Sequence, residues 1–126
     1  MSRKHSVIFV PGLGGESYLF RKAANSWNRF GFIPVIHDVM WKDGQQYFRP
    51  KLEKLLSRID ELYASGGIIS LVGTSAGGSA VLNAFTQRSE KIHRIVNICG
   101  RLRAGNSVYP TLENASLKSN SFKESV

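Results

Sequence analysis

The stretch of this chain that says most about its fold reads Ile68-Ile69-Ser70-Leu71-Val72-Gly73-Thr74-Ser75-Ala76-Gly77. It opens with a mainly apolar run typical of a buried strand, and residues 78–85, which follow it, have the pattern of a helix. The turn between them has the spacing Gly-x-Ser-x-Gly. In the order strand, turn, helix, this spacing predicts a sharp turn that exposes the hydroxyl of Ser75 above a sheet. The alternative interpretation is a glycine-rich turn with an inert serine.

The glycines around Ser75 have a steric explanation. Gly73 and Gly77 are expected where a side chain would collide with the adjoining strand and helix. Gly78 is expected to let the helix pack closely against its neighbours.

The composition fits one domain of ordinary size. The chain has 126 residues, of which 42% are hydrophobic, enough for a single core. No run of about eighteen apolar residues is present, so no transmembrane segment is expected. The first apolar run, residues 7–10, is too short for a signal-peptide core. A cytoplasmic location is therefore the default expectation.

The formal charge of +8 could indicate a nucleic-acid or anionic-membrane partner. However, the basic residues are spread along the chain, and no aromatic stacking pattern accompanies them. We therefore expect no specific nucleic-acid partner and interpret the charge as a solvated surface. Arg101 and Arg103 follow a predicted strand and are candidates for contact with an anionic group.

Cys99 is the only cysteine, which excludes an internal disulfide and a cysteine-based metal site. It lies in a strand-like run, where a small buried side chain is the expected role. We expect no metal and no cofactor.

Strands and helices are expected to alternate along the chain. The predicted strands are residues 6–10, 32–39, 68–72 and 92–99, and the predicted helices are residues 17–30, 47–64 and 76–87. This alternation predicts an α/β fold: a three-layer αβα sandwich with a mainly parallel sheet. Pro34 cannot donate to a ladder, so its strand should lie at a sheet edge.

Two apolar helix faces are expected to cover the sheet. The face of the first helix consists of Leu19, Ala23, Trp27 and Phe30. The stripe of the second helix consists of Leu52, Leu55, Leu56, Ile59, Leu62 and Tyr63.

A second loop should meet the turn at Ser75. Ligands of parallel sheets bind beyond the carboxyl ends of the strands, and Pro11-Gly12-Leu13-Gly14-Gly15 follows the first strand there. An acyl-transfer serine needs backbone N–H donors for the developing oxyanion. The expected donors are the N–H of Ala76, at the start of a helix, and the N–H of Leu13. The alternative for the loop is a flexible turn, and it lacks the spacing of a phosphate-binding loop.

With both glycine motifs in place, the chain resembles the α/β-hydrolase fold family, especially small lipases and esterases, from Ser6 to about Arg103. The resemblance implies that Ser75 is the nucleophile and that Leu13 and Ala76 form the oxyanion hole. It implies a serine hydrolase that acts on a small-molecule carboxylic ester or thioester through an acyl-serine intermediate. Residues 1–104 would be the N-terminal part of such a domain, and residues 105–126 a polar tail, read as a loop or disordered end, or the start of a missing C-terminal half.

The sequence departs from this family in its catalytic base. The family order is serine, acid, histidine. After Cys99 the chain has only Glu113 and Glu124 as acids and no histidine. Two of the three histidines, His5 and His93, are expected at the wrong end of the sheet.

The third, His37, is expected at the better end. The strand order of the family implies that the first strand separates it from the strand before Ser75, a backbone gap of about 10 Å. A structural role is the expected one for His37.

Three hypotheses follow. The chain is the N-terminal part of a longer serine hydrolase, a non-catalytic remnant that binds acyl compounds, or a basic interaction module that reuses the fold. If the domain is truncated, the side of the strand at residues 92–99 is exposed, which predicts self-association through that sheet edge.

Overall fold

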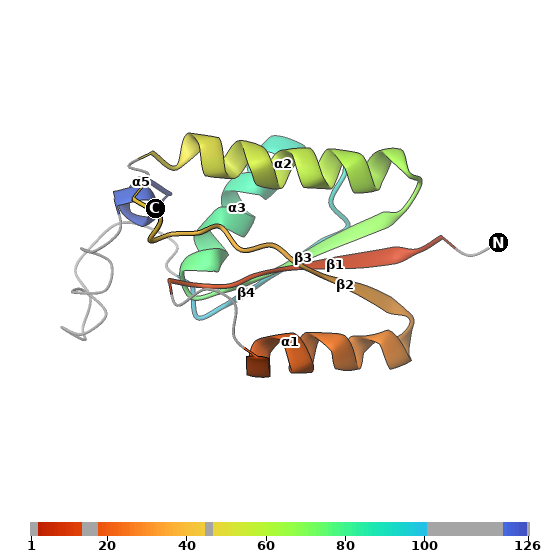
Figure 1. Cartoon of the computed structure of the whole chain (residues 1–126). Coiled ribbons are helices and arrows are strands. Elements are labelled where there is room, and N and C mark those ends of the chain that lie inside the picture. Colours follow the sequence, from red (N-terminus) through yellow and green to blue (C-terminus); the bar gives the residue numbers. More distant parts are fainter. Residues whose placement is uncertain (1–2, 14–17, 45–46, 101–119, 126) are drawn as a thin grey trace.

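The computed structural model describes residues 3–13, 18–44, 47–100 and 120–125 (Figure 1). The strands are β1 (His5–Val10), β2 (Phe32–Ile36), β3 (Ile68–Thr74) and β4 (Arg94–Ile98). The helices are α1 (Tyr18–Asn25), the 3-10 helix η1 (Ser26–Phe30), α2 (Arg49–Ala64), α3 (Ala76–Arg88) and α5 (Asn120–Ser125). Each predicted strand and helix is present, with bounds that differ by a few residues at the ends.

The strands form one parallel sheet in the order β2-β1-β3-β4. The chain moves outward from β1 to β2 and then returns past β1 to β3. Because parallel crossovers are right-handed, this reversal puts α1 on one face of the sheet and α2 and α3 on the other (Figure 1). The predicted three-layer α/β fold is confirmed. The reversal also opens the carboxyl edge of the sheet between β1 and β3, where such folds bind ligands.

Alternating residues of β1 supply both sides of the core, because successive side chains of a strand point to opposite faces. Ile8 and Val10 are buried in the larger cluster with α2 and α3. Val7 and Phe9 are buried in a smaller cluster with Ala24 of α1. This two-sided burial explains why the strand reads as a continuous apolar run.

Pro34 lies in β2 at one edge of the sheet, as its missing N–H predicted. In the register of the sheet it stands beside Val7 of β1. At the opposite edge, β4 alternates between exposed and partly buried residues. Val96 and Ile98 are 48% and 47% exposed, so this edge strand carries apolar side chains that the described residues do not cover.

The predicted face of the first helix is wrong in part. Ala23 and Phe30 are exposed, whereas Ala24 is fully buried. For Phe30 the reason is a change of helix type at Ser26, where α1 passes into η1. A 3-10 helix has three residues per turn rather than 3.6, so the apolar face moves out of phase and Phe30 points away from the sheet.

Three other expectations also differ from the structure. Tyr63, predicted on the apolar stripe of the second helix, is 42% exposed. Cys99 is exposed and lies just after β4 with φ 56°, so it is not a buried strand residue. Within the tail, residues 120–125 form α5 rather than a loop. The Ser125 hydroxyl is 2.6 Å from the Ser79 hydroxyl, and the Asn83 amide donates to the Ser125 carbonyl at 2.8 Å. These contacts hold α5 against α3.

A buried lysine holds the segment between β2 and α2. The Lys51 ammonium donates to the carbonyls of Val39 and Met40, at 3.3 and 2.5 Å, and pairs with Asp43 at 2.8 Å. This role of Lys51 was not predicted from the sequence. The available signal was that Lys51 stands one turn before Leu55 on the apolar stripe of the helix.

Candidate active site

Ser75 stands at the junction of β3 and α3 in a strained conformation. Its backbone has φ 52° and ψ −122°, outside the regions that non-glycine residues ordinarily occupy, and the residue is exposed. Two hydrogen bonds fix it. The Ser75 N–H donates to the Ile98 carbonyl at 2.9 Å, and the Gly78 N–H donates to the Ser75 carbonyl at 3.0 Å. Strain that the surrounding structure enforces in this way is typical of functional sites.

Close backbone packing explains the glycines of the turn. A Cβ atom on Gly77 would lie 1.9 Å from the Val10 carbonyl oxygen, and one on Gly73 would lie 2.5 Å from the Gly77 oxygen. A Cβ on Gly78 would lie 2.2 Å from Oδ1 of Asn97 in β4. The predicted steric requirement is therefore confirmed at all three positions.

The loop after β1 lies directly against the turn. A Cβ atom on Gly12 would stand 3.0 Å from Cβ of Ser75 and 3.3 Å from the backbone nitrogen of Ala76. Leu13, the next residue, is partly buried and packs on the larger core cluster. The fold thus brings together the segments that carry Ser75, Ala76 and Leu13. Gly14 and Gly15 lie outside the described residues.

The indole of Trp41 is hydrogen-bonded to the same loop. Nε1 of Trp41 donates to the Pro11 carbonyl at 3.3 Å, and the Trp41 ring stacks on Phe48 with centroids 5.8 Å apart. The segment after β2, which Lys51 holds, is thereby joined to the segment after β1. Sequence reasoning had assigned no role to Trp41, which stands in a turn whose partner is distant in the chain.

The histidines lie away from Ser75. Nε2 of His5 is 2.8 Å from the Ser70 hydroxyl, and the His5 ring centroid is 5.7 Å from that of His93, at the amino ends of the strands. His37 directly follows β2 and its N–H donates to the Phe9 carbonyl at 2.8 Å. The sheet order places β1 between β2 and β3, as predicted. Among the described residues, no histidine bonds to the Ser75 hydroxyl.

Burial and a positive neighbour lower the basicity of His37. Its pKa falls to about 4, first because the ring is buried and then because of the Arg58 charge. Lys54 acts in the same direction, and Asp38 opposes it. A general base works best with a pKa near the working pH, so His37 is a weak base at neutral pH.

Of the acids and arginines that follow β4, only Glu124 lies within the described residues. The Glu124 carboxylate accepts the N–H of Phe48 at the start of α2. Glu113, Arg101 and Arg103 lie outside the described residues. Within the described ranges, no three His, Cys, Asp or Glu side chains gather in a way that could hold a metal ion. Over those same ranges, the helices are too short or too polar to cross a membrane.

Comparisons with known proteins identify the fold. A structure from a study of LipS and LipT, two metagenome-derived lipolytic enzymes, superposes with a TM-score of 0.69 at 17% identity, over 91% of this chain and 47% of the other. A structure of RedJ with a polyethylene glycol molecule in its active site superposes with a TM-score of 0.56 at 15% identity, over 98% of this chain and 58% of the other. Neither the family models nor the curated proteins give a match.

These likenesses define the architecture. At such identities they show the fold, and that fold is part of an α/β-hydrolase core. The chain spans about half the length of the solved structures that it matches. The resemblance found in the sequence is thus confirmed at the level of the fold.

Proposed function

We propose that Ser75 is the nucleophile of a serine hydrolase and that the N–H groups of Leu13 and Ala76 hold the oxyanion. The observation that carries this proposal is the strained, exposed Ser75 with the Gly12 backbone packed against it. This arrangement leaves the serine exposed and brings the Gly12 backbone close to the Ala76 nitrogen. Gly73 and Gly77 support it, because their packing enforces a turn that would otherwise relax.

The proposed reaction is acyl transfer. The Ser75 hydroxyl oxygen attacks the carbonyl carbon of a carboxylic ester or thioester while its proton passes to a base. The resulting oxyanion accepts hydrogen bonds from Leu13 and Ala76, and the dipole of α3 adds positive charge at Ala76. Collapse expels the alcohol or thiol, and water then releases the acid from the acyl-serine. The lipolytic neighbour favours an ester substrate for this chain.

We infer that the base is a histidine from outside this 126-residue sequence. The placement of the three histidines supports this inference: His5 and His93 lie at the opposite end of the sheet, and His37 lies beyond β1 with a lowered pKa. Without a base, a serine hydrolase keeps only about 10³–10⁴-fold catalysis over water. The 126-residue chain alone should therefore turn over esters very slowly.

Labelling with a fluorophosphonate probe tests the nucleophile. We expect covalent labelling of Ser75 in a version extended along its gene to a later histidine, and no labelling of the Ser75→Ala variant. Ser89→Ala, at an exposed serine that follows α3, is the matched control and should label like the parent. Absence of labelling in both the extended and the 126-residue protein would overturn the proposal. Rapid hydrolysis of p-nitrophenyl esters by the short chain, lost in Ser75→Ala, would overturn the inferred base.

A second candidate is a non-catalytic protein that binds acyl compounds. The absence of an imidazole beside the Ser75 hydroxyl, within the residues that the structure describes, favours it. Saturable binding of an ester analogue to an extended chain that does not react with fluorophosphonate would identify this function.

A further inference from the structure

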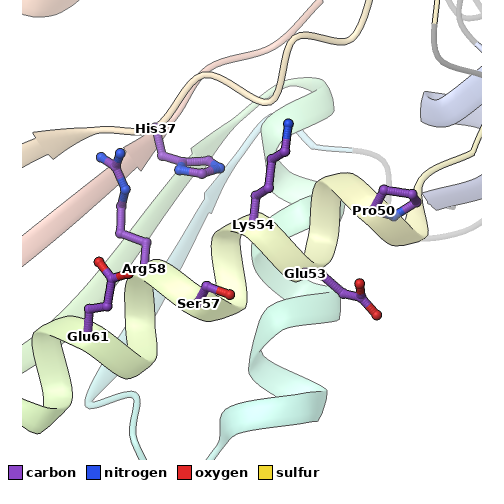
Figure 2. Close-up of a pocket in the computed structure, with 7 residues that line it drawn as sticks. All are labelled: His37, Pro50, Glu53, Lys54, Ser57, Arg58 and Glu61. Carbon is purple, nitrogen blue, oxygen red and sulfur yellow. The ribbon is translucent and has the colours of Figure 1, made fainter.

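A surface depression of about 550 Å³ lies between the end of β2 and α2 (Figure 2). It is lined by His37 and by side chains from successive turns of α2, including Lys54, Ser57 and Arg58. Because β1 separates β2 from β3, the depression is distinct from the turn at Ser75. Its size is in the range of pockets that take small organic molecules.

The imidazole of His37 is the unusual group in this depression. The residue is only 9% exposed, yet its ring makes no hydrogen bond to the part of the chain that the structure describes. A neutral imidazole carries one N–H donor and one acceptor, and its nitrogens are not enclosed here, because Asn97 Oδ1 is the only enclosed side-chain nitrogen or oxygen atom without a partner in the described part of the chain. In Figure 2 the side chains of Lys54 and Arg58 extend on either side of this ring. The unused ring nitrogens therefore face a space that two cations flank.

The charges around the ring are predominantly positive. Lys54 and Arg58 are one helical turn apart and exposed, and neither forms an ion pair with a described residue. Glu53, which also lines the depression, is paired with Arg49 at 3.2 Å.

Arg58 keeps most of its donors available, because its hydrogen bonding to the described residues is a long contact of 3.5 Å to the Ile36 carbonyl. The remaining carboxylate in the lining is Glu61. The two uncompensated cations therefore outnumber it.

We propose that this depression binds the phosphoryl group of a small phosphomonoester between Lys54, Arg58 and His37. The planar guanidinium can hold two phosphate oxygens, the ammonium supplies a point charge, and the imidazole donates from the sheet side. Three donors from different directions match a tetrahedral group with three free oxygens better than a planar carboxylate with two. A dianion also matches the two cations.

Titration with inorganic phosphate, phenyl phosphate and acetate, followed by the imidazole NMR signals of His37, tests the proposal. We expect saturable binding of both phosphates, with acetate at least about tenfold weaker. Bound phosphate should raise the pKa of His37, because its negative charge stabilises the imidazolium against the effects of burial, Arg58 and Lys54, in the same direction as Asp38. Tighter binding of phenyl phosphate than of inorganic phosphate would identify the organic ester as the ligand class.

Variants separate a built site from general charge attraction. Lys54→Ala and Arg58→Gln should each weaken phosphate binding by about tenfold or more. Lys22→Ala removes the same charge from exposed α1, on the other face of the sheet, and should leave affinity unchanged. Equal weakening in Lys22→Ala, equal affinity for acetate, or an unchanged His37 signal would overturn the proposal. Fluorophosphonate labelling of Ser75 is independent of all three results.

Discussion

The backbone conformation of Ser75 is strained, and the surrounding residues keep it in place. A serine at φ 52° departs from ordinary geometry, at a cost of order 1–3 kcal/mol. Ser75 is hydrogen-bonded to Ile98 and Gly78, and the Gly12 backbone lies close to it. These contacts keep the turn in its strained conformation. Such geometry exposes a hydroxyl above the sheet, which is why the proposed nucleophile is Ser75 rather than buried Ser79.

Gly77 is the residue whose substitution should damage this turn most. Its missing side chain leaves room for the Val10 carbonyl, which would lie 1.9 Å from a Cβ atom. Gly77→Ala should lower the free energy of unfolding by about 3 kcal/mol, measured by urea denaturation, because backbone rather than a mobile side chain must move. Gly44→Ala is the control. At Gly44 no atom lies within 4 Å of the added carbon, and the cost is only that of a side chain at φ 87°, about 1 kcal/mol. Equal losses in the two variants would refute the steric explanation.

At the scale of elements, α2 is tied to its surroundings at both ends. Near its start, Glu124 of α5 accepts the Phe48 N–H. Near its end, Asp60 pairs with Arg88 of α3 at 2.9 Å and with Lys91 at 3.0 Å. These polar contacts lie at the two ends of the buried stripe that packs α2 on the sheet.

The Asp60 pairs should make stability depend on pH. Hydrogen bonds from Arg88 and then Lys91 lower the pKa of Asp60 in the folded chain. A lowered folded-state pKa means that the pairs stabilise the fold above the ordinary pKa of aspartate and that this contribution is lost as the pH falls through the folded value. Asp60→Asn should therefore be less stable than the parent at pH 7, and the difference should shrink as the pH falls below the ordinary pKa of aspartate, about 4, and through the lower folded-state value.

Urea midpoints measured across this pH range check the prediction. Glu53→Gln is the control, because its pair with Arg49 has side chains 60% and 61% exposed and should contribute little. A difference between Asp60→Asn and the parent that persists unchanged in acid would contradict the ion-pair explanation.

For the whole molecule, the two edges of the sheet differ. Pro34 interrupts the edge at β2, whereas β4 contains no proline, no described strand pairs with its outer side, and its Val96 and Ile98 are exposed. Val96 stands beside Val72 in the sheet. Val72 is buried in the cluster that includes Ala24 of α1, whereas Val96 is exposed. An exposed apolar edge of this kind favours pairing with another chain.

We therefore expect the 126-residue chain to self-associate through β4. Its elution volume in size-exclusion chromatography should fall as concentration rises, and Val96→Lys should reduce this effect by placing charge on the edge strand. Ile33→Lys, at a similarly exposed position on the edge that carries Pro34, should elute like the parent. A monomer at all concentrations would rule out association through this edge.

The sequence predicted the features that depend on local pattern and sterics. Pro34 predicted an edge strand, the alternation of strands and helices predicted a parallel sheet, and the glycine spacing around Ser75 predicted the tight turn. The strand order was implied by the family resemblance. The features that the sequence did not predict depend on contacts between residues far apart in the chain or on a change of helix type. Phe30 is turned outward by a switch of helix type. The anchor from Trp41 to Pro11 joins residues 30 positions apart. The roles of Ser75, Leu13 and Ala76 stay predictions.

The burial of Lys51 has a consequence for the chemistry of the folded surface. Its ammonium is enclosed by the Val39 and Met40 carbonyls and Asp43, whereas Lys54, one turn further along α2, is open to solvent. The two amines should therefore react differently with an acylating reagent. Lys54 reacts in the native state, whereas Lys51 becomes available only when the segment before α2 detaches. Acylation of Lys51 therefore reports the opening of that segment.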